Sequence, residues 1–202
     1  NNSPARHMAT KLIKVLFPEA LFRVAKAYQR CPNASLYTGG IAVGFPGDGG
    51  IRKCSYPAHP LIWFRRYDVY FVGQMGTFFN KITYDKTDGI NINLFQTMDR
   101  DILYKLLTVN KKVVRIPGLI GFIRFHEGAK SSPKFPEHRN IRHRGIADFF
   151  NRNGIDPRMY KFLLIVQRLL RLLIGNYLVC YIYTTIFKNR RMSEIWEQYN
   201  KT

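Results

Sequence analysis

The N-terminal part of the chain alternates between helical and strand patterns of apolar residues. Pro18 and Glu19 mark the opening of a helix whose apolar residues recur at helical spacing as far as Tyr28. Pro32 ends this predicted helix, because proline cannot continue the helical hydrogen bonding. Residues 35–43 are rich in β-type side chains and predict a strand. The turn-forming residues 45–50 then indicate a hairpin tip.

The same alternation continues to residue 125. Residues 61–64 are a short apolar run consistent with a buried strand, and residues 68–72 predict a helix that ends at Gly73. The polar segment 80–93 predicts an exposed loop or insertion. Leucine and isoleucine residues form a helical stripe after Asp99: Ile102, Leu103, Leu106 and Leu107. Residues 112–116 and 119–125 predict two further strands. We therefore expect an α/β layered domain.

The C-terminal part has a different character. Residues 128–144 resemble a loop, with prolines, serines and many bases, and a long helical pattern runs from Tyr160 onward. We expect three parts: a ragged N-terminus at 1–14, a domain at 15–150, and a basic amphipathic helical tail at 151–202.

Composition narrows the class of protein but not its ligand. The chain has 202 residues, of which 46% are hydrophobic and 14% aromatic, which excludes a disordered protein. Its net charge of +19 attracts polyanions: nucleic acid, an anionic membrane surface or a phosphorylated substrate. Charge alone leaves all three open.

The cysteines favour a reducing compartment. There are three of them, widely spaced and with no CxxC pair, so we predict reduced thiols in the cytosol. His138 and His143 lack the spacing to cysteine or carboxylate that a zinc site requires.

Four sequence patterns follow one another in a characteristic order over residues 15–132. They are the helix-then-strand pattern of residues 18–37, HPLIWFRR at 59–66 with Val72-Gly73, TMDRDIL at 97–103, and the segment from Ile116-Pro117 to RFHEGAKS at 124–131. This order resembles the acceptor-side portion of family 2 glycosyltransferases. The resemblance implies a partial GT-A-like α/β fold with a C-terminal helical tail.

The resemblance also implies an activity. It predicts inverting transfer of a sugar from a nucleotide-sugar donor to a glycan or lipid-linked acceptor, with Mn²⁺ or Mg²⁺ as cofactor, in polysaccharide biosynthesis. Two features depart from the family. The 80–93 insertion is longer than expected, and no aspartate precedes Pro18, so the Asp-x-Asp donor half is missing. We expect either a fragment or a chain that has lost donor binding.

By the resemblance, Asp99 is the general base that takes the proton of the attacking hydroxyl. The positive end of a helix dipole stabilises a carboxylate, so a place at a helix N-terminus favours the ionised form. Asp101 is expected to support it by capping the helix or orienting neighbours. The alternative is that Asp99 is only a helix N-cap, because aspartate is a preferred cap.

Basic and aromatic residues complete the predicted site. Arg124, His126 and Lys130 are expected on the diphosphate side, with His126 as a metal ligand, and a solvated basic loop is the alternative. On the acceptor side we expect His59, Trp63, Arg65 and Arg66. Trp63 suits stacking on a sugar ring but equally suits a core position.

The tail predicts contact with a membrane. Residues 162–187 approach the length of a span, but Arg168 and Arg171 interrupt them, and arginine near a helix centre costs about 2.5–3.5 kcal/mol on insertion. We therefore expect a helix lying on an anionic membrane surface, with the protein peripheral on its cytoplasmic face. The alternative is that this helix packs on the domain.

A non-catalytic basic binding protein, for a membrane surface or nucleic acid, is the alternative function. Nucleic acid is the less favoured partner, because no helix-turn-helix, zinc finger or RNP-type strand is recognisable.

Overall fold

The computed structural model describes residues 15–44, 50–57, 74–94, 97–124 and 136–200. Over these ranges the chain is mixed α/β, as the alternating patterns predict. The strands are β1 (Val15–Leu16), β2 (Leu36–Gly44), β3 (Ile51–Ser55), β4 (Thr77–Phe79) and β5 (Val113–Arg124). The helices are α2 (Ala20–Arg30), α3 (Lys81–Tyr84), α4 (Met98–Val109), α5 (Pro136–Asn153), α6 (Pro157–Leu173), α7 (Asn176–Phe187) and α8 (Met192–Asn200), with a 3₁₀ turn, η2 (Gln74–Gly76).

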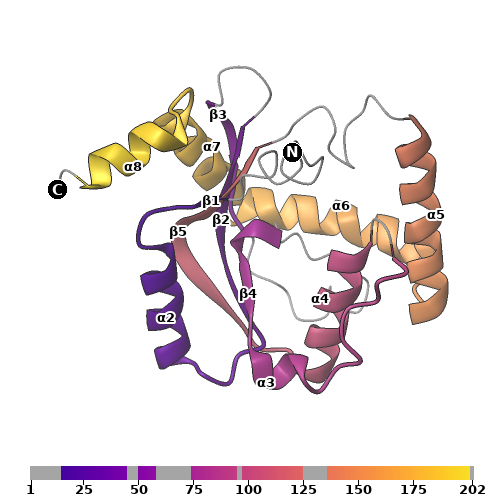
Figure 1. The fold of residues 1–202 in the computed structure, drawn as a ribbon. Helices are drawn as coiled ribbons and strands as arrows, with labels where there is room; N and C mark the ends of the chain where they lie inside the picture. Colours follow the sequence, from indigo (N-terminus) through magenta and orange to yellow (C-terminus); the bar gives the residue numbers. More distant parts are fainter. Residues whose placement is uncertain (1–14, 45–49, 58–73, 95–96, 125–135, 201–202) are drawn as a thin grey trace, which may run out of the picture.

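One mixed sheet organises these elements, in the order β1-β5-β2-β3 (Figure 1). β2 and β5 pair in parallel, whereas the other pairs are antiparallel. β3 and β4 flank the same side of β2, β3 at its carboxyl end and β4 at its amino end. Because β2 and β5 run the same way, Gly44 and Arg124 end at one edge of the sheet.

Helices cover β2 on both faces, which explains why nearly all of this strand is buried. Leu36 packs with buried residues of α4, and its neighbour Tyr37 packs with alanines of α2 on the opposite face. Successive side chains of a strand point to opposite faces. A layered α/β arrangement follows, with β2 and β5 at its centre.

The structure joins the two strands predicted at 112–116 and 119–125 into one. β5 runs unbroken from Val113 to Arg124, and its register with β2 shifts between Thr38 and Gly40. Gly118, at φ 80°, takes up the irregularity in a backbone conformation that glycine tolerates. The Pro117-Gly118 pair therefore marks a bulge and not a turn.

Three other predicted boundaries are corrected. The 80–93 segment is not simply a loop: Asn80 is buried and caps α3, its side chain accepting from the Ile82 amide. Residues from Pro136 are helical in α5, although the sequence predicted a loop to residue 144. The long C-terminal pattern is three helices, because Gly175 and Asn189 adopt left-handed conformations that end α6 and α7.

Other predictions fare differently. The helix expected after Pro18-Glu19 is confirmed as α2, but it begins at Ala20 because Glu19 has a left-handed φ of 57°. The strand predicted at 35–43 and the helix after Asp99 are confirmed as β2 and α4. The predicted strand at 61–64, the helix at 68–72 and the hairpin tip itself lie outside the described residues.

Close backbone packing gives a first prediction. A Cβ on Gly121 would overlap the backbone oxygen of Met75, whereas a Cβ on Gly154 meets nothing within 4 Å and carries only a left-handed φ of 62°. We expect Gly121→Ala to lower the free energy of unfolding by about 3 kcal/mol, because backbone must move. Gly154→Ala should cost about 1 kcal/mol. Urea denaturation measures both, and equal losses would contradict the close approach of η2 to β5.

Candidate functional site

The N-terminus of α4 points toward the edge where β2 and β5 end. Residues 110–112 connect α4 directly to β5, so the helix runs back along the strand in the opposite direction. Ile102 and Leu106 bury the inner face of α4 against Leu36 of β2. In α/β sheets, ligands bind outside the carboxyl ends of the parallel strands. α4 therefore presents its positive end toward the side of the sheet where a ligand site is expected.

Asp99 lies in the first turn of α4 with its side chain exposed. Thr97 occupies the N-cap position, and the Asp99 carboxylate accepts a hydrogen bond from the Arg100 amide at 2.9 Å. The predicted place at a helix start is thus confirmed, and Asp99 is not the N-cap residue of the alternative interpretation. Its carboxylate is open to a ligand.

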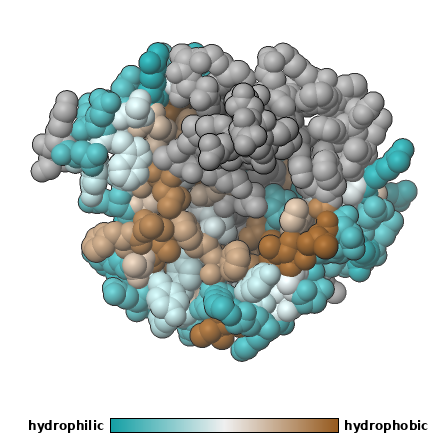
Figure 2. Space-filling model, viewed as in Figure 1, coloured by the Kyte–Doolittle hydropathy of each residue, from teal (hydrophilic) through white to brown (hydrophobic). Residues whose placement is uncertain are grey.

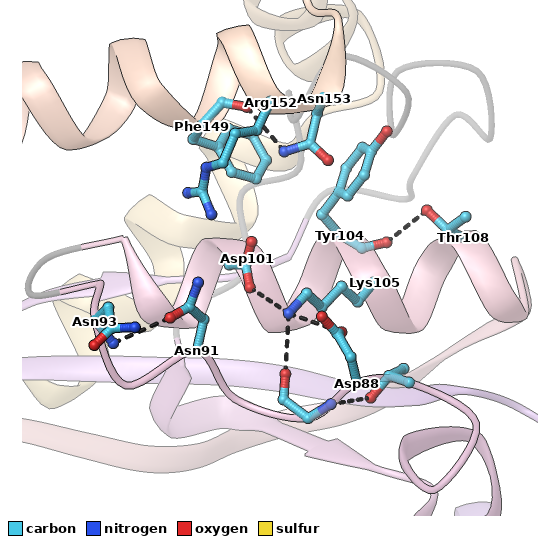
Figure 3. Close-up of polar contacts among 12 residues, drawn as sticks. Asp88, Asn91, Asn93, Asp101, Tyr104, Lys105, Thr108, Phe149, Arg152 and Asn153 are labelled. Atoms are coloured by element: carbon cyan, nitrogen blue, oxygen red, sulfur yellow. Dashed lines mark hydrogen bonds and ion pairs between the residues drawn. The ribbon is translucent and has the colours of Figure 1, made fainter.

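Asp101 is buried and has a different role from Asp99 (Figure 3). Lys105, one turn further along α4, forms an ion pair with Asp101, with its Nζ 2.8 Å from Asp101 Oδ2. The same ammonium group also contacts Asp88 Oδ1 at 2.8 Å and donates to the Gly89 carbonyl at 3.1 Å. We call these four residues the Lys105 clamp. It ties the 88–89 segment to the helix that carries Asp99, so Asp101 orients neighbours and does not cap the helix.

The clamp shifts the titration of two of its members. Burial alone lowers the pKa of the Lys105 ammonium, but its hydrogen bonds to Asp101 and Asp88 outweigh burial and raise it. The hydrogen bond from Lys105 lowers the pKa of the exposed Asp88 carboxyl below its ordinary value. Lys105 and Asp88 are therefore held in their charged forms around neutral pH.

α5 lies on the other side of α4 from the 88–93 segment (Figure 3). Phe149 of α5 is fully buried and meets the Tyr104 ring edge-on, with centroids 5.5 Å apart. The Arg100 guanidinium lies 6.0 Å from the Phe149 centroid, and Gly145 approaches Thr97 at the N-cap. α5 thus borders the Asp99 region.

The surface of α5 beside this region is hydrophilic. His143 and Arg144 are exposed on it, and the right-hand rim of the molecule, where α5 lies, is teal in Figure 2. The sequence prediction of a loop to residue 144 missed this helix, and with it the approach of Gly145 to Thr97 and of Phe149 to Arg100. The i, i+4 spacing of Asp101 and Lys105 is a signal for the clamp that the sequence shows. The contact between α4 and α5 has no such signal in the sequence.

The remaining predicted site residues are not brought to Asp99 by the described structure. Arg124 ends β5 at the expected edge, but its side chain lies outside the described residues. The rest of the set lies there entirely: His59, Trp63, Arg65, Arg66, His126 and Lys130. Their predicted roles stay predictions.

The described residues do not fit a metal centre. Within these ranges, no three or more His, Cys, Asp or Glu side chains gather where they could hold a metal ion. Asp101 and Asp88, which share one contact with Lys105, are already neutralised by its ammonium group. No chemical step is therefore assigned to a metal here.

The clamp predicts a strong effect for one lysine. Lys105→Met leaves the Asp101 carboxylate buried without its partner, so we expect the free energy of unfolding to fall by about 3–5 kcal/mol. Lys81→Met is the matched control, because Lys81 and Asp85 form an exposed pair of the same spacing, at 84% and 51% exposure. The control should lose less than about 1 kcal/mol. Urea denaturation measures the free energy of unfolding of both variants. In the double-mutant cycle, Asp101→Asn/Lys105→Met should recover part of the stability that Lys105→Met loses.

Acid should remove the contribution of Asp88. The pKa of Asp88 in the folded state is lowered from 3.8, so its ionised carboxylate stabilises the fold above that pH. This stabilisation is lost as the pH falls through the folded-state pKa. Wild type should thus exceed Asp88→Asn in stability at neutral pH, and the difference should vanish once the pH has fallen below the folded-state pKa. Urea denaturation across this range checks it, and a difference that persists in acid would contradict the ion pair.

Comparison with known proteins assigns no family to this site. No protein-family model matches the chain, and no curated protein matches it at a significant level. The features that bear on function are the exposed Asp99 carboxylate, the Lys105 clamp and the edge of the sheet that α4 faces.

Proposed function

We propose that this chain is the acceptor-side half of a GT-A-like, inverting glycosyltransferase of family 2. The observation that carries the proposal is the position of Asp99. Its exposed carboxylate stands in the first turn of α4, which faces the edge where the parallel strands β2 and β5 end. The order of motifs that resembles this family supplies the reaction class, and the geometry is compatible with it.

The chemistry requires a positioned base. In inverting transfer, the acceptor hydroxyl oxygen forms a bond to the anomeric carbon while its proton passes to the base. The bond from that carbon to the diphosphate breaks, and the nucleoside diphosphate leaves with the electron pair. Asp99 is the proposed base because it is exposed, lies at a helix N-terminus and has no ion-pair partner among the interactions of the described residues.

The Lys105 clamp supports this role through rigidity. A general base must lie within hydrogen-bond reach of the hydroxyl it activates, so its helix must not move. Lys105 joins Asp101, two residues after Asp99, to Asp88 and Gly89. Asp101 is thus a positioning residue in the proposal, and its neighbour Asp99 is the catalytic one.

The proposal keeps the nucleotide sugar and a glycan or lipid-linked acceptor as substrates. Arg124, at the end of β5, and the following His126 and Lys130 are the proposed diphosphate-side residues. His59, Trp63, Arg65 and Arg66 are the proposed acceptor-side residues. Only the resemblance to the family implies a divalent cation, and no group of ligands for one is found among the described residues.

Asp99→Asn tests the base. The protein from the complete reading frame that encodes this chain is assayed for turnover of a panel of nucleotide sugars with Mn²⁺. We expect Asp99→Asn to lower kcat by about 10²–10⁴-fold, because the amide cannot accept the proton. Asp85→Asn, at another exposed carboxylate, should leave kcat unchanged.

Two outcomes would overturn the proposal. Unchanged turnover in Asp99→Asn would remove the base, and the absence of turnover for every nucleotide sugar would favour the non-catalytic binding protein. Circular dichroism and urea denaturation of each variant establish that the fold is kept, since Asp99 is exposed and its substitution should cost little stability.

A further inference from the structure

The helices α6 and α7 expose an apolar surface that nothing else in the described structure covers. On α6 the exposed residues recur three and four apart, so they form one stripe: Phe162, Ile165, Leu169, Leu172 and Leu173, each more than half exposed. The stripe continues on α7 through Leu178, Tyr181, Ile182 and Ile186. Monomeric soluble proteins rarely expose contiguous apolar patches of such extent.

The opposite face of α6 is buried, and that of α7 packs on the sheet. Leu163 and Gln167, four apart on α6, are buried. On α7, Thr184 accepts a hydrogen bond from the Cys54 amide of β3 at 2.9 Å, and the Tyr183 ring stacks on Tyr56 at 5.7 Å. Each helix therefore has a packed face and a free apolar face, so neither can be surrounded by lipid.

The bend between the helices is locked. α6 and α7 meet at 66°, and Gly175, at φ 67°, ends α6. Arg171 donates to the Asn176 side chain at 2.8 Å and lies over the Tyr177 ring, and Asn176 donates to the Tyr56 carbonyl at 3.3 Å. We call Arg171, Asn176 and Tyr177 the elbow. It presents both apolar stripes in a fixed arrangement.

The charged residues along α6, α7 and the turn that follows are all basic. Residues 157–193 contain seven lysines and arginines and not one aspartate or glutamate. Lys161 and Arg168 are exposed and lie seven residues apart, at one border of the α6 stripe. Lys188, Arg190 and Arg191 are exposed just beyond α7. A second copy of the same surface would be repelled, whereas an anionic surface would be attracted.

We infer that α6 and α7 dock, in the plane of the interface, on a bilayer that contains anionic lipid. No single helix of the described part is long and apolar enough to cross a membrane, while the bent pair meets that requirement only when taken together. Lipid contact through one face fits the packed opposite faces, the elbow and the bordering bases. This inference is independent of the proposed sugar transfer.

Vesicle binding tests it. The chain is mixed with sucrose-loaded vesicles of phosphatidylcholine, with or without about 30% phosphatidylserine, and sedimented. We expect binding to the anionic vesicles, weakened by salt, and little binding to the neutral ones. Equal binding to both compositions, or none to either, would overturn the inference.

Matched variants separate this surface from the rest of the molecule. Leu169→Gln/Leu172→Gln/Leu178→Gln should lower the partition coefficient at least about tenfold, because three exposed apolar side chains no longer enter the interface. Leu21→Gln/Phe22→Gln on α2, at residues 62% and 66% exposed, should leave it unchanged. The first turn of α2 also carries apolar surface, at the left of Figure 2. Equal losses in both variants would overturn the assignment to α6 and α7.

Charge variants follow the same design. Arg158→Gln/Lys161→Gln/Arg168→Gln should weaken binding by about fivefold per base, since each base near an anionic surface contributes similarly. Lys26→Gln/Arg30→Gln/Lys111→Gln removes the same charge from exposed positions elsewhere and should weaken it far less. An equal loss in both variants would show attraction by net charge alone and would overturn docking through this surface.

The last two measurements test how deeply the helices enter the bilayer and whether the chain self-associates. Leu172→Trp fluorescence, corrected for wild-type tryptophans, should be quenched more by lipids brominated near the headgroup than by lipids brominated near the chain ends. Deeper quenching would indicate a broken span and overturn in-plane docking. Sedimentation velocity should show a monomer without vesicles. A dimer dispersed by the leucine variant would instead assign the surface to a second copy.

Discussion

The parallel pairing of β2 with β5 is the constraint on which the rest of this structure depends. It requires both faces of β2 to be covered, because a central strand with apolar side chains on both faces cannot be left to water. α2 and α4 supply that cover. The pairing also brings the ends of two strands to one edge, and the connection from α4 to β5 turns the N-terminus of α4 toward it.

The geometry of the candidate site follows from this arrangement. Asp99 is exposed because it lies in the first turn of α4, beyond the part of the helix that packs on Leu36. Asp101 and Lys105 lie on the side of the helix that holds the 88–89 segment, so one carboxylate is structural while its neighbour stays open. Two aspartates in the first turn of one helix thus differ in burial and in partner, because only Asp101 has a lysine four residues further along the helix.

The C-terminal helices attach to the same sheet through β3. Backbone hydrogen bonds join Ile51 to Asn189 and Arg190, and α7 packs along β3, so the tail is part of the domain on one side. The two interpretations of the tail, packing on the domain or lying on a membrane, are therefore compatible, because each uses a different face of α6 and α7. Figure 1 shows these helices leading away from α5 toward β3.

The sequence by itself determined the elements whose patterns are local. The periodicity of α2, the β-type residues of β2 and the stripe of α4 predicted these elements, and the bases within the apolar run of residues 162–187 predicted an amphipathic helical tail. Only the tertiary structure decided that Pro117-Gly118 is a bulge, since strand pairing across β2 spans the break. Only it decided that Phe149 of α5 lies beside Arg100, because that contact joins residues far apart in the chain. The 66° elbow likewise depends on Asn176 reaching the Tyr56 carbonyl, and no periodicity along a single helix carries such a hydrogen bond.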